Sequence, residues 1–334
     1  MLTLQPKGLY CPAGDFYVDP SGPVRRAVIT HAHGDHARTG SQAYLAHRSS
    51  IPVLRHRLGR SITIQGAEYG EVVEERGVKI SLHPAGHIPG SAQIRIESAG
   101  QVWVVSGDYK TEPDKLCEPF EAVRCNTFIS EATFGLPIYH WLPQEQVWGA
   151  INEWWSANSA QGRASVMQVY SLGKAQRILA YVDHSIGPVV AHPTVYTTTL
   201  AVKEGGAELP DMLLASKDLS RETLRKALVL APPSARASGW LKHMPHPVIA
   251  NASGWMMLRT LRAKSGVDTT FVLSDHADWE GLRSAIKATS AERVLLTHGY
   301  SQSLSRCLRE EGVDAEVMEV ALGGRIERGS GETE

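Results

Sequence analysis

Residues 30–37, THAHGDHA, place three histidines and one aspartate within eight positions, directly after the run RAVI at 26–29. A run rich in β-branched residues predicts a short strand that ends where the polar residues begin. In an extended loop, side chains two positions apart point to the same side. We therefore expect His31 and His33 to bind one metal ion together.

Two metal ions would need more ligands than this pair provides. Gly34 permits a tight turn, after which Asp35 and His36 point toward a second position. Carboxylate oxygen together with imidazole suits Zn²⁺, Mn²⁺ or a similar ion. Further candidate ligands lie just beyond predicted strands or in loops flanked by glycine, namely His87, Asp108, His276 and His298. The number of candidates fits a site for two metals, and four metal-competent groups in six residues would have no purpose on an ordinary surface.

The composition is that of an ordinary globular protein. The chain has 334 residues, of which 43% are hydrophobic, and its formal net charge is −1. This length allows a large core and more than one lobe, and the balanced charge means that any polyanion site must be local. The four cysteines form no CxxC pair, which suits a reducing compartment. With no signal sequence and no apolar run of about 18 residues, these features predict a cytoplasmic protein without membrane segments.

Strands that end in polar residues fall into two blocks of the sequence, before about residue 136 and after about residue 267. The first block includes QVWVVSGDY and NTFISEATFG, and the second includes DTTFVLSDHADW and AERVLLTHGY. Each combines a β-branched or aromatic run with residues that can do chemistry. Because two strand ends can share one site only if they fold together, we expect the two blocks to form one domain.

Between these blocks the pattern changes to a separate α/β segment. A helix is predicted from about 143 to 158, in which Trp148, Ile151 and Trp155 share one face. Strand, turn and helix then alternate, which predicts a parallel βαβ arrangement. The predicted organisation is therefore one domain in two parts, 1–136 and 268–334, with an inserted α/β domain at 137–267.

Two turns of the inserted segment are predicted to bind phosphate. In VYSLGKAQRIL a strand ends and a helix begins, so free amide groups and the helix dipole can face an anion. The alternative is that Gly173 only caps this helix and that Lys174 is only a solvated residue at its start. Arg177 is expected to be a solvated helix residue. The predicted phosphate-binding residues of the two turns are Ser171, Gly173, Lys174, Ser253 and Gly254.

Several of these motifs resemble those of a known fold. THAHGDHA, AGHIPGSA and SGDY resemble the second, third and fourth motifs of the metallo-β-lactamase fold, and FYVDP, with Asp19, resembles the first. SEATFG with Glu131, SDHADW with His276 and THGY with His298 resemble the three additional motifs of the β-CASP nucleases. Within that branch, the short length and LSDHADW beside SGWMMLR are most similar to the bacterial ligase-associated DNA exonucleases. The resemblance implies an αββα metallo-β-lactamase sandwich with an inserted α/β β-CASP domain.

The resemblance also implies a role for each residue of the motifs. One metal would be held by His31, His33 and His87, the other by Asp35, His36 and His298, with Asp108 bridging both. Asp19 would orient a ligand histidine through a hydrogen bond. Glu131 would hold and charge His276, the general acid, so that Asp35, His276 and Glu131 are the implied catalytic residues. The cofactors would be two divalent ions, Zn²⁺ or Mn²⁺.

The predicted function is a metal-dependent phosphodiesterase, a DNA exonuclease that acts on single strands or DNA ends in repair. A hydroxide activated by two metals would attack the phosphodiester, and His276 would protonate the departing sugar oxygen. The implied partners are nucleic acid, with DNA favoured over RNA and digestion from the 5′ end favoured, and, functionally, a DNA ligase and a helicase. No membrane partner is expected.

Three alternatives remain at the level of sequence. An RNA-processing nuclease of the ribonuclease J or 3′-end endonuclease type fits His298, since DNA-repair members of the branch often carry an apolar residue there. A hydrolase of thioesters or lactams would lack Glu131, His276 and the inserted domain. A non-catalytic scaffold would usually have lost ligands, and this sequence keeps every one.

Overall fold

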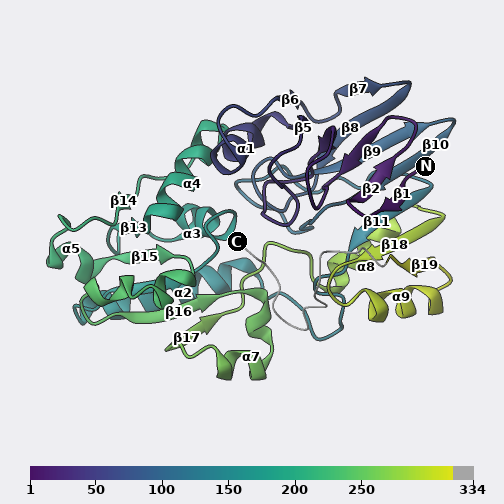
Figure 1. The fold of residues 1–334 in the computed structure, drawn as a ribbon. Coiled ribbons are helices and arrows are strands. Elements are labelled where there is room, and N and C mark those ends of the chain that lie inside the picture. Colours follow the sequence, from purple (N-terminus) through teal and green to yellow (C-terminus); the bar gives the residue numbers. More distant parts are fainter. Residues whose placement is uncertain (319–334) are drawn as a thin grey trace. The chain divides into compact units, whose positions relative to one another are not determined.

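The computed structural model describes residues 1–318, which form two compact units (Figure 1). The first unit comprises Met1–Tyr139, Glu204–Gly206 and the described residues from His276 onward. The second comprises His140–Lys203 and Ala207–Asp275. None of the helices in residues 1–318 combines the length and the apolar character needed to cross a membrane.

The first unit begins with a sheet of six strands. Their bounds are β1 (Thr3–Gln5), β2 (Gly8–Cys11), β3 (Phe16–Val18), β4 (Arg26–Val28), β5 (Ala43–His47) and β6 (Ile64–Ala67). They lie in this order across the sheet, antiparallel as far as β3 and parallel from β3 to β6. Strand β4 confirms the strand predicted before THAHGDHA. Between β5 and β6 the chain forms the short 3₁₀ helix η1 (Arg48–Ser50) and helix α1 (Ile51–Leu58).

The second sheet of this unit has seven strands, drawn from both ends of the chain. Their bounds are β7 (Val72–Glu75), β8 (Val78–Pro84), β9 (Ala92–Ser98), β10 (Gln101–Val105), β11 (Thr127–Glu131), β18 (Arg293–Thr297) and β19 (Asp314–Val317). The spatial order is β19-β18-β11-β10-β9-β8-β7. Strands β7 to β10 form an antiparallel meander, whereas β10, β11, β18 and β19 run parallel. The chain thus leaves this sheet after β11 and returns to it at β18.

Two apolar cores hold the first unit together. One lies between the sheets, where residues such as Val28 and Leu45 of the first sheet meet Ile80 and Ile94 of the second. The other lies on the opposite face of the second sheet, which is covered by helices α8 (Trp279–Ala288) and α9 (Ser301–Glu310) through residues such as Leu282. With α1 beside the first sheet, the layers form the αββα sandwich expected from the sequence.

The second unit is built on a six-stranded sheet in which every pairing is parallel. In spatial order its strands are β14 (Leu213–Leu214), β13 (Val189–Ala191), β15 (Leu228–Ala231), β12 (Ser165–Gln168), β16 (Val248–Ala252) and β17 (Thr269–Phe271). Its helices are α2 (Gln144–Ala160), α3 (Lys174–Tyr181), α4 (Pro193–Glu204), α5 (Arg221–Lys226), α6 (Ser234–Ala237) and α7 (Arg259–Lys264), with 3₁₀ helices η2 (Trp240–His243) and η3 (Gly254–Met257). This arrangement confirms the predicted parallel α/β segment.

Two details of the second unit differ from the expected boundaries. Strand β17, which precedes His276, pairs with β16 through Ala250 opposite Thr269 and so belongs to the sheet of the second unit. The division of the chain falls at Asp275, eight residues after the predicted boundary at 267. The sequence pattern identifies a strand here, but hydrogen-bond partners decide which sheet receives it.

Helix α2 carries the largest fully buried side chain of the molecule and so offers a test of the second unit. Trp155 is 0% exposed and donates its indole N–H to the carbonyl of Lys226 at 3.0 Å. We expect Trp155→Ala to lower the free energy of unfolding by about 3–5 kcal/mol, because it leaves a large cavity and an unpaired carbonyl. Chemical denaturation measures this. The exposed Glu153→Ala on the same helix is the control and should change stability by less than about 0.5 kcal/mol; an equal effect of both substitutions would refute the packing.

Candidate metal centre

The candidate ligands lie in loops that leave one edge of the two sheets. The loop after β4 carries His31, His33, Asp35 and His36, and His87 lies between β8 and β9. Strands β8, β10, β11 and β18 all run in the same direction, so their carboxyl ends meet at a common edge. Glu131 is the last residue of β11, and Asp108 and His298 follow β10 and β18.

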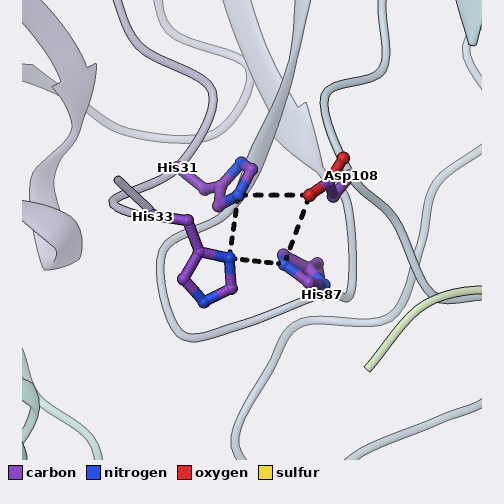
Figure 2. A group of neighbouring side chains, drawn as sticks. All are labelled: His31, His33, His87 and Asp108. Atoms are coloured by element: carbon purple, nitrogen blue, oxygen red, sulfur yellow. Dashed lines mark hydrogen bonds and ion pairs between the residues drawn. The ribbon is translucent and has the colours of Figure 1, made fainter. Parts of the chain in front are cut away.

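Four buried or half-buried side chains converge on one point, as Figure 2 shows. Nδ1 of His33 lies 3.1 Å from Nε2 of His31 and 3.1 Å from Nε2 of His87. The Oδ2 atom of Asp108 closes the ring, at 3.5 Å from Nε2 of His31 and 3.8 Å from Nε2 of His87. One ligand atom from each residue lies within 4.8 Å of all the others, so these four residues could hold a metal ion.

The spacing of these atoms fits a tetrahedral metal site. With metal–nitrogen distances of about 2.0–2.1 Å, tetrahedral geometry places neighbouring ligand atoms about 3.3–3.4 Å apart. The measured separations of 3.1–3.8 Å bracket this value. Burial and the neighbouring imidazoles of His36, His87 and His33 hold the pKa of His31 well below its ordinary value, so this ring is neutral and able to donate a lone pair.

A second position lies beside the first and shares Asp108. Nε2 of His36 is 3.5 Å from Oδ2 of Asp108 and 3.8 Å from Oδ2 of Asp35. The His298 ring lies 5.7 Å from the His36 ring, between centroids. The structure therefore brings all seven predicted ligands to one region. Among these seven, the ligand atoms of His31, His33, His87 and Asp108 lie within 4.8 Å of one another.

The electrostatic balance at the second position favours a positive charge. Burial, the largest influence on His36, acts to lower its pKa, but Asp108, Asp35 and Asp19 together raise the pKa to about 10. Burial in turn raises the pKa of Asp108 to about 7, against the opposing effect of His36. A divalent cation between these groups would supply the positive charge that the buried carboxylates favour. The donor set and its charge thus both fit a metal pair.

A hydrogen-bond network behind the ligands fixes their orientation. Asp19 accepts from the backbone N–H of Thr30 at 2.8 Å and from its hydroxyl at 2.5 Å, and its Oδ2 lies 2.8 Å from Nδ1 of His36. With Nδ1 held in this way, Nε2 of His36 faces the shared Asp108. Thr30 Oγ1 also lies 3.1 Å from Nδ1 of His31. Asp19 therefore fixes the ring of His36 through Nδ1, and its role in orienting a metal ligand stays a prediction.

The role of Thr30 in this network was not predicted from the sequence. Its position directly before the histidine motif, at the end of a buried strand, was the available signal. Gly107 packs against it: this glycine has φ +58°, and a Cβ atom there would lie 2.6 Å from Cβ of Thr30. Only glycine allows this close approach next to Asp108.

Glu131 and His276 form a pair next to the metal cluster. Nδ1 of His276 lies 2.9 and 3.0 Å from the two carboxylate oxygens of Glu131, and ligand atoms of Asp108, Glu131 and His276 lie within 4.8 Å of one another. The backbone N–H of Tyr109 also donates to Glu131, at 2.8 Å. Burial, the largest single influence on Glu131, acts to raise its pKa, but His276, Thr133 and Tyr109 together lower the pKa and so favour the ionised carboxylate. The His276 ring is 4.7 Å from the His87 ring, between centroids.

The predicted phosphate turn at the start of α3 is organised differently from the expectation. Gly173 has φ +89°, and its N–H donates to Oε1 of Gln176 at 2.7 Å, so this amide is not free for an anion. Lys174 is buried, with Nζ 3.6 Å from Oδ2 of Asp275 and 4.7 Å from the centre of the Tyr170 ring. The backbone of Ser171 accepts from Gln176 at 2.9 Å. These contacts stabilise the turn within the second unit, as in the alternative in which Gly173 only caps the helix.

The prediction for Arg177 was wrong. This residue is 4% exposed rather than solvated, and its guanidinium donates to Oδ1 of Asp275 at 3.1 Å and to the carbonyl of Ser274 at 2.5 Å. Most residues of the short helix α3 are buried. The face of the helix that carries Arg177 is therefore not exposed to solvent.

The second predicted phosphate turn and the AGHIPGSA loop also use their polar groups internally. Ser253 accepts from the N–H of Trp255 at 3.3 Å and caps η3, whose first residue is the buried Gly254. Ser91 of the AGHIPGSA loop accepts from the N–H groups of His87 and Ile88 at 3.1 and 3.2 Å. Its hydroxyl therefore stabilises the turn that presents His87.

Comparisons with known proteins agree with this architecture. No protein-family model matches the sequence. A protein named "Probable DNA ligase" from Opitutus terrae is 31% identical over 310 residues, covering 92% of this chain and 30% of that protein. "Endoribonuclease ysh-1" of Neurospora crassa is 26% identical, covering 53% of this chain and 22% of the relative. "Cleavage and polyadenylation specificity factor subunit 3" of Dictyostelium discoideum is 29% identical, covering 44% of this chain and 19% of the relative. The chain spans less than a third of the length of each of these relatives.

A solved structure shares the fold across both units. The crystal structure of a protein of unknown function from Enterococcus faecalis V583 superposes with a TM-score of 0.55 at 13% sequence identity. It covers 90% of this chain and 80% of the other. At this level of identity the similarity concerns the fold alone.

The αββα sandwich, with histidines and aspartates gathered where its strands end, defines a protein of the metallo-β-lactamase fold. The additional Glu131–His276 pair, the inserted α/β unit and the relatives narrow this class. The chain belongs to the β-CASP family of that fold.

The network around Asp19 predicts how strongly the ligands depend on it. We expect Asp19→Ala to weaken metal binding by about 10–100-fold, because His36 would lose the partner that fixes its ring. Competition between the protein and a chromogenic chelator for Zn²⁺ measures this. Asp15→Ala is the control, since Asp15 pairs with Arg25 and Arg76 and lies outside the network. Equal Zn²⁺ affinity in Asp19→Ala and the parent would show that Asp19 does not contribute to metal binding.

Proposed function

We propose that the protein is a metal-dependent nuclease, specifically a DNA exonuclease that acts on single strands or DNA ends in repair. The observation that carries this proposal is the shared position of Asp108, which lies within 4.8 Å of the ligand atoms of His31, His33 and His87 and also of Glu131 and His276. A metal cluster and a proton donor thus face the same reaction centre. This is the combination that phosphodiester cleavage requires.

In this proposal, the two ligand sets have separate tasks. One ion would be held by His31, His33 and His87 and the other by Asp35, His36 and His298, with Asp108 between them. Two divalent ions bound there would supply the Lewis acidity that activates water and offsets the charge of the phosphate. Zn²⁺ and Mn²⁺ both suit this mixture of imidazole and carboxylate ligands.

His276 would deliver a proton to the departing sugar oxygen. Glu131 accepts a hydrogen bond from Nδ1 of His276, which leaves Nε2 as the atom that donates the proton. The ionised carboxylate stabilises a positive charge on the imidazole and fixes the plane of the ring. Because three protein groups already hold Glu131, namely Tyr109 and Thr133 through backbone N–H groups and His276 through its ring, the pair is rigid.

The choice of DNA over RNA rests on a different observation. The relative that matches 92% of this chain is named "Probable DNA ligase", which favours DNA as the substrate. A role in repair and functional association with a ligase and a helicase stay predictions. RNA processing is the second candidate, because relatives named as endoribonucleases match part of the chain and His298 is present as in RNA-processing members. Incubation with Mn²⁺ or Zn²⁺ and end-labelled DNA and RNA tests the two: release of labelled mononucleotides from RNA alone would refute the DNA proposal.

Removing a shared ligand should stop the reaction. We expect Asp108→Ala, and likewise Asp35→Ala, to reduce cleavage of labelled single-stranded DNA to background while the melting temperature shows that the chain still folds. Loss of Asp108 removes the carboxylate common to both ligand sets. Asp314→Ala, at an exposed position of β19, is the matched control and should retain full activity. Normal turnover in either site variant would overturn the assignment.

The His276 variant separates proton transfer from metal binding. We expect His276→Ala to slow cleavage by about 10²–10⁴-fold, the usual contribution of a general acid. Elemental analysis should find the same metal content as in the parent, because His276 is held by Glu131 rather than by the ligand cluster. His140→Ala, at an exposed position, is the control. Loss of metal from His276→Ala would identify the residue as a ligand instead.

A further inference from the structure

Helix α1, labelled in Figure 1, and its flanks are rich in arginine. From Arg48 to Ala67 the chain contains no aspartate or glutamate, whereas the whole chain has slightly more acidic than basic residues. The arginines of this segment are Arg48, Arg55, Arg57 and Arg60. Arg55 and Arg60 are exposed, and so is Arg38, in the loop that follows the histidine motif. We call Arg38, Arg55, Arg57 and Arg60 the α1 arginines, of which Arg55 and Arg57 lie within the helix itself.

This basic surface reaches the metal centre through Arg57. Its guanidinium donates to the carbonyl of Ala32, the residue between His31 and His33. Burial, chiefly, lowers the pKa of Arg57, while the Asp35 carboxylate raises it and Arg38 lowers it further, so Arg57 interacts with both groups. Arg57 therefore contacts the loop of the histidine motif directly, and Arg38 follows His36 on the same loop by two residues.

The backbone of Arg38 is fixed although its side chain is exposed. The carbonyl of Arg38 accepts from the hydroxyl of the buried Tyr44 at 2.8 Å. One residue earlier, the N–H of Ala37 donates to the carbonyl of His33 at 2.9 Å. The Arg38 side chain thus extends into solvent from a rigid base on the metal-binding loop, which reduces the entropy lost when it contacts a ligand.

Carboxylates neutralise little of this charge. Arg48 pairs with Glu68 at 2.5 Å, but within residues 1–318 Arg38, Arg55 and Arg60 form no ion pair with a carboxylate. Like charges gathered on one surface repel one another unless an anion lies between or across them. Arg55 and Arg57 are two positions apart on a helix, so they point in different directions and do not form a cradle for a single small anion.

We infer that the α1 arginines bind successive phosphates of a nucleic acid strand and guide it to the metal centre. The inference rests on the proposed function and deepens it, because it names the surface of the first unit that holds the substrate backbone. Separate guanidinium groups on α1, on its C-terminal flank and on the loop of the histidine motif suit a polymer with repeated phosphates better than a single small anion. The turns of the second unit, by contrast, use their amide and ammonium groups internally.

Binding at different salt concentrations tests this surface separately from cleavage. The parent is the full chain with Asp108→Ala, which prevents digestion, and the probe is a short fluorescein-labelled single-stranded DNA followed by anisotropy between about 50 and 200 mM salt. We expect Arg38→Ala to weaken binding by about 3–10-fold and to reduce the slope of log affinity against log salt by about 0.7, the value for one phosphate contact to a single strand. Arg55→Ala and Arg60→Ala should act in the same direction, and Arg38→Glu more strongly.

Arg306→Ala is the matched control for these variants. It removes the same charge from an exposed position on α9, where Arg306 pairs with Glu310 at 3.0 Å, and should leave both affinity and slope unchanged. Unchanged slopes in Arg38→Ala, Arg55→Ala and Arg60→Ala would overturn the inference, as would a parent that binds neither DNA nor RNA. If the chain with Asp108 intact cleaves DNA but the slopes do not change, only this inference fails. If the slopes change but no nucleic acid is cleaved, only the proposed function fails.

Discussion

Strands β11 and β18 lie side by side in the second sheet, with Glu131 opposite Thr297, although the whole second unit separates them in the chain. Because the two strands are parallel, their carboxyl ends reach the same edge, and the residues that follow them meet there. Glu131 ends one strand and His298 follows the other. The loops after β4, β8 and β10 complete the candidate site, so the Glu131–His276 pair and the candidate ligands depend on this pairing.

The second constraint on the site is electrostatic. Several carboxylates and imidazoles are buried together, which costs free energy unless opposite charges or hydrogen bonds compensate them. The structure provides this compensation through hydrogen bonds behind the rings and through an ion pair beside them. Asp19 and Thr30 hold the ligand rings from behind, and Glu131 is ionised against His276. Burial raises the pKa of Asp108 to about 7, so its ionised form costs free energy that a cation at the point where the candidate ligand atoms converge would offset.

The sequence predicted those parts of the molecule that depend on local pattern. The strand before the histidine motif, helix α2 with its buried Trp155, and the parallel segment all follow from periodicity and motif spacing. It did not predict features that depend on distant partners. The amide of Gly173 looked free because nothing in the pattern shows that Gln176 turns back to accept from it, and Arg177 looked solvated because its partner Asp275 lies far along the chain. The same limit applies to β17, whose sheet is set by its pairing with β16.

Two residues of the centre, Asp19 and His298, adopt left-handed backbone angles, with φ 42° and 58°. A residue with a Cβ atom loses roughly 1 kcal/mol or more in this region compared with glycine. Selection for a more stable chain would therefore favour glycine at both positions, and selection for chemistry opposes it, since glycine has no carboxylate or imidazole. Aspartate and histidine at these positions cost backbone stability but supply a carboxylate and an imidazole to the centre, so a change to glycine would relax the backbone and remove a side chain of the candidate site.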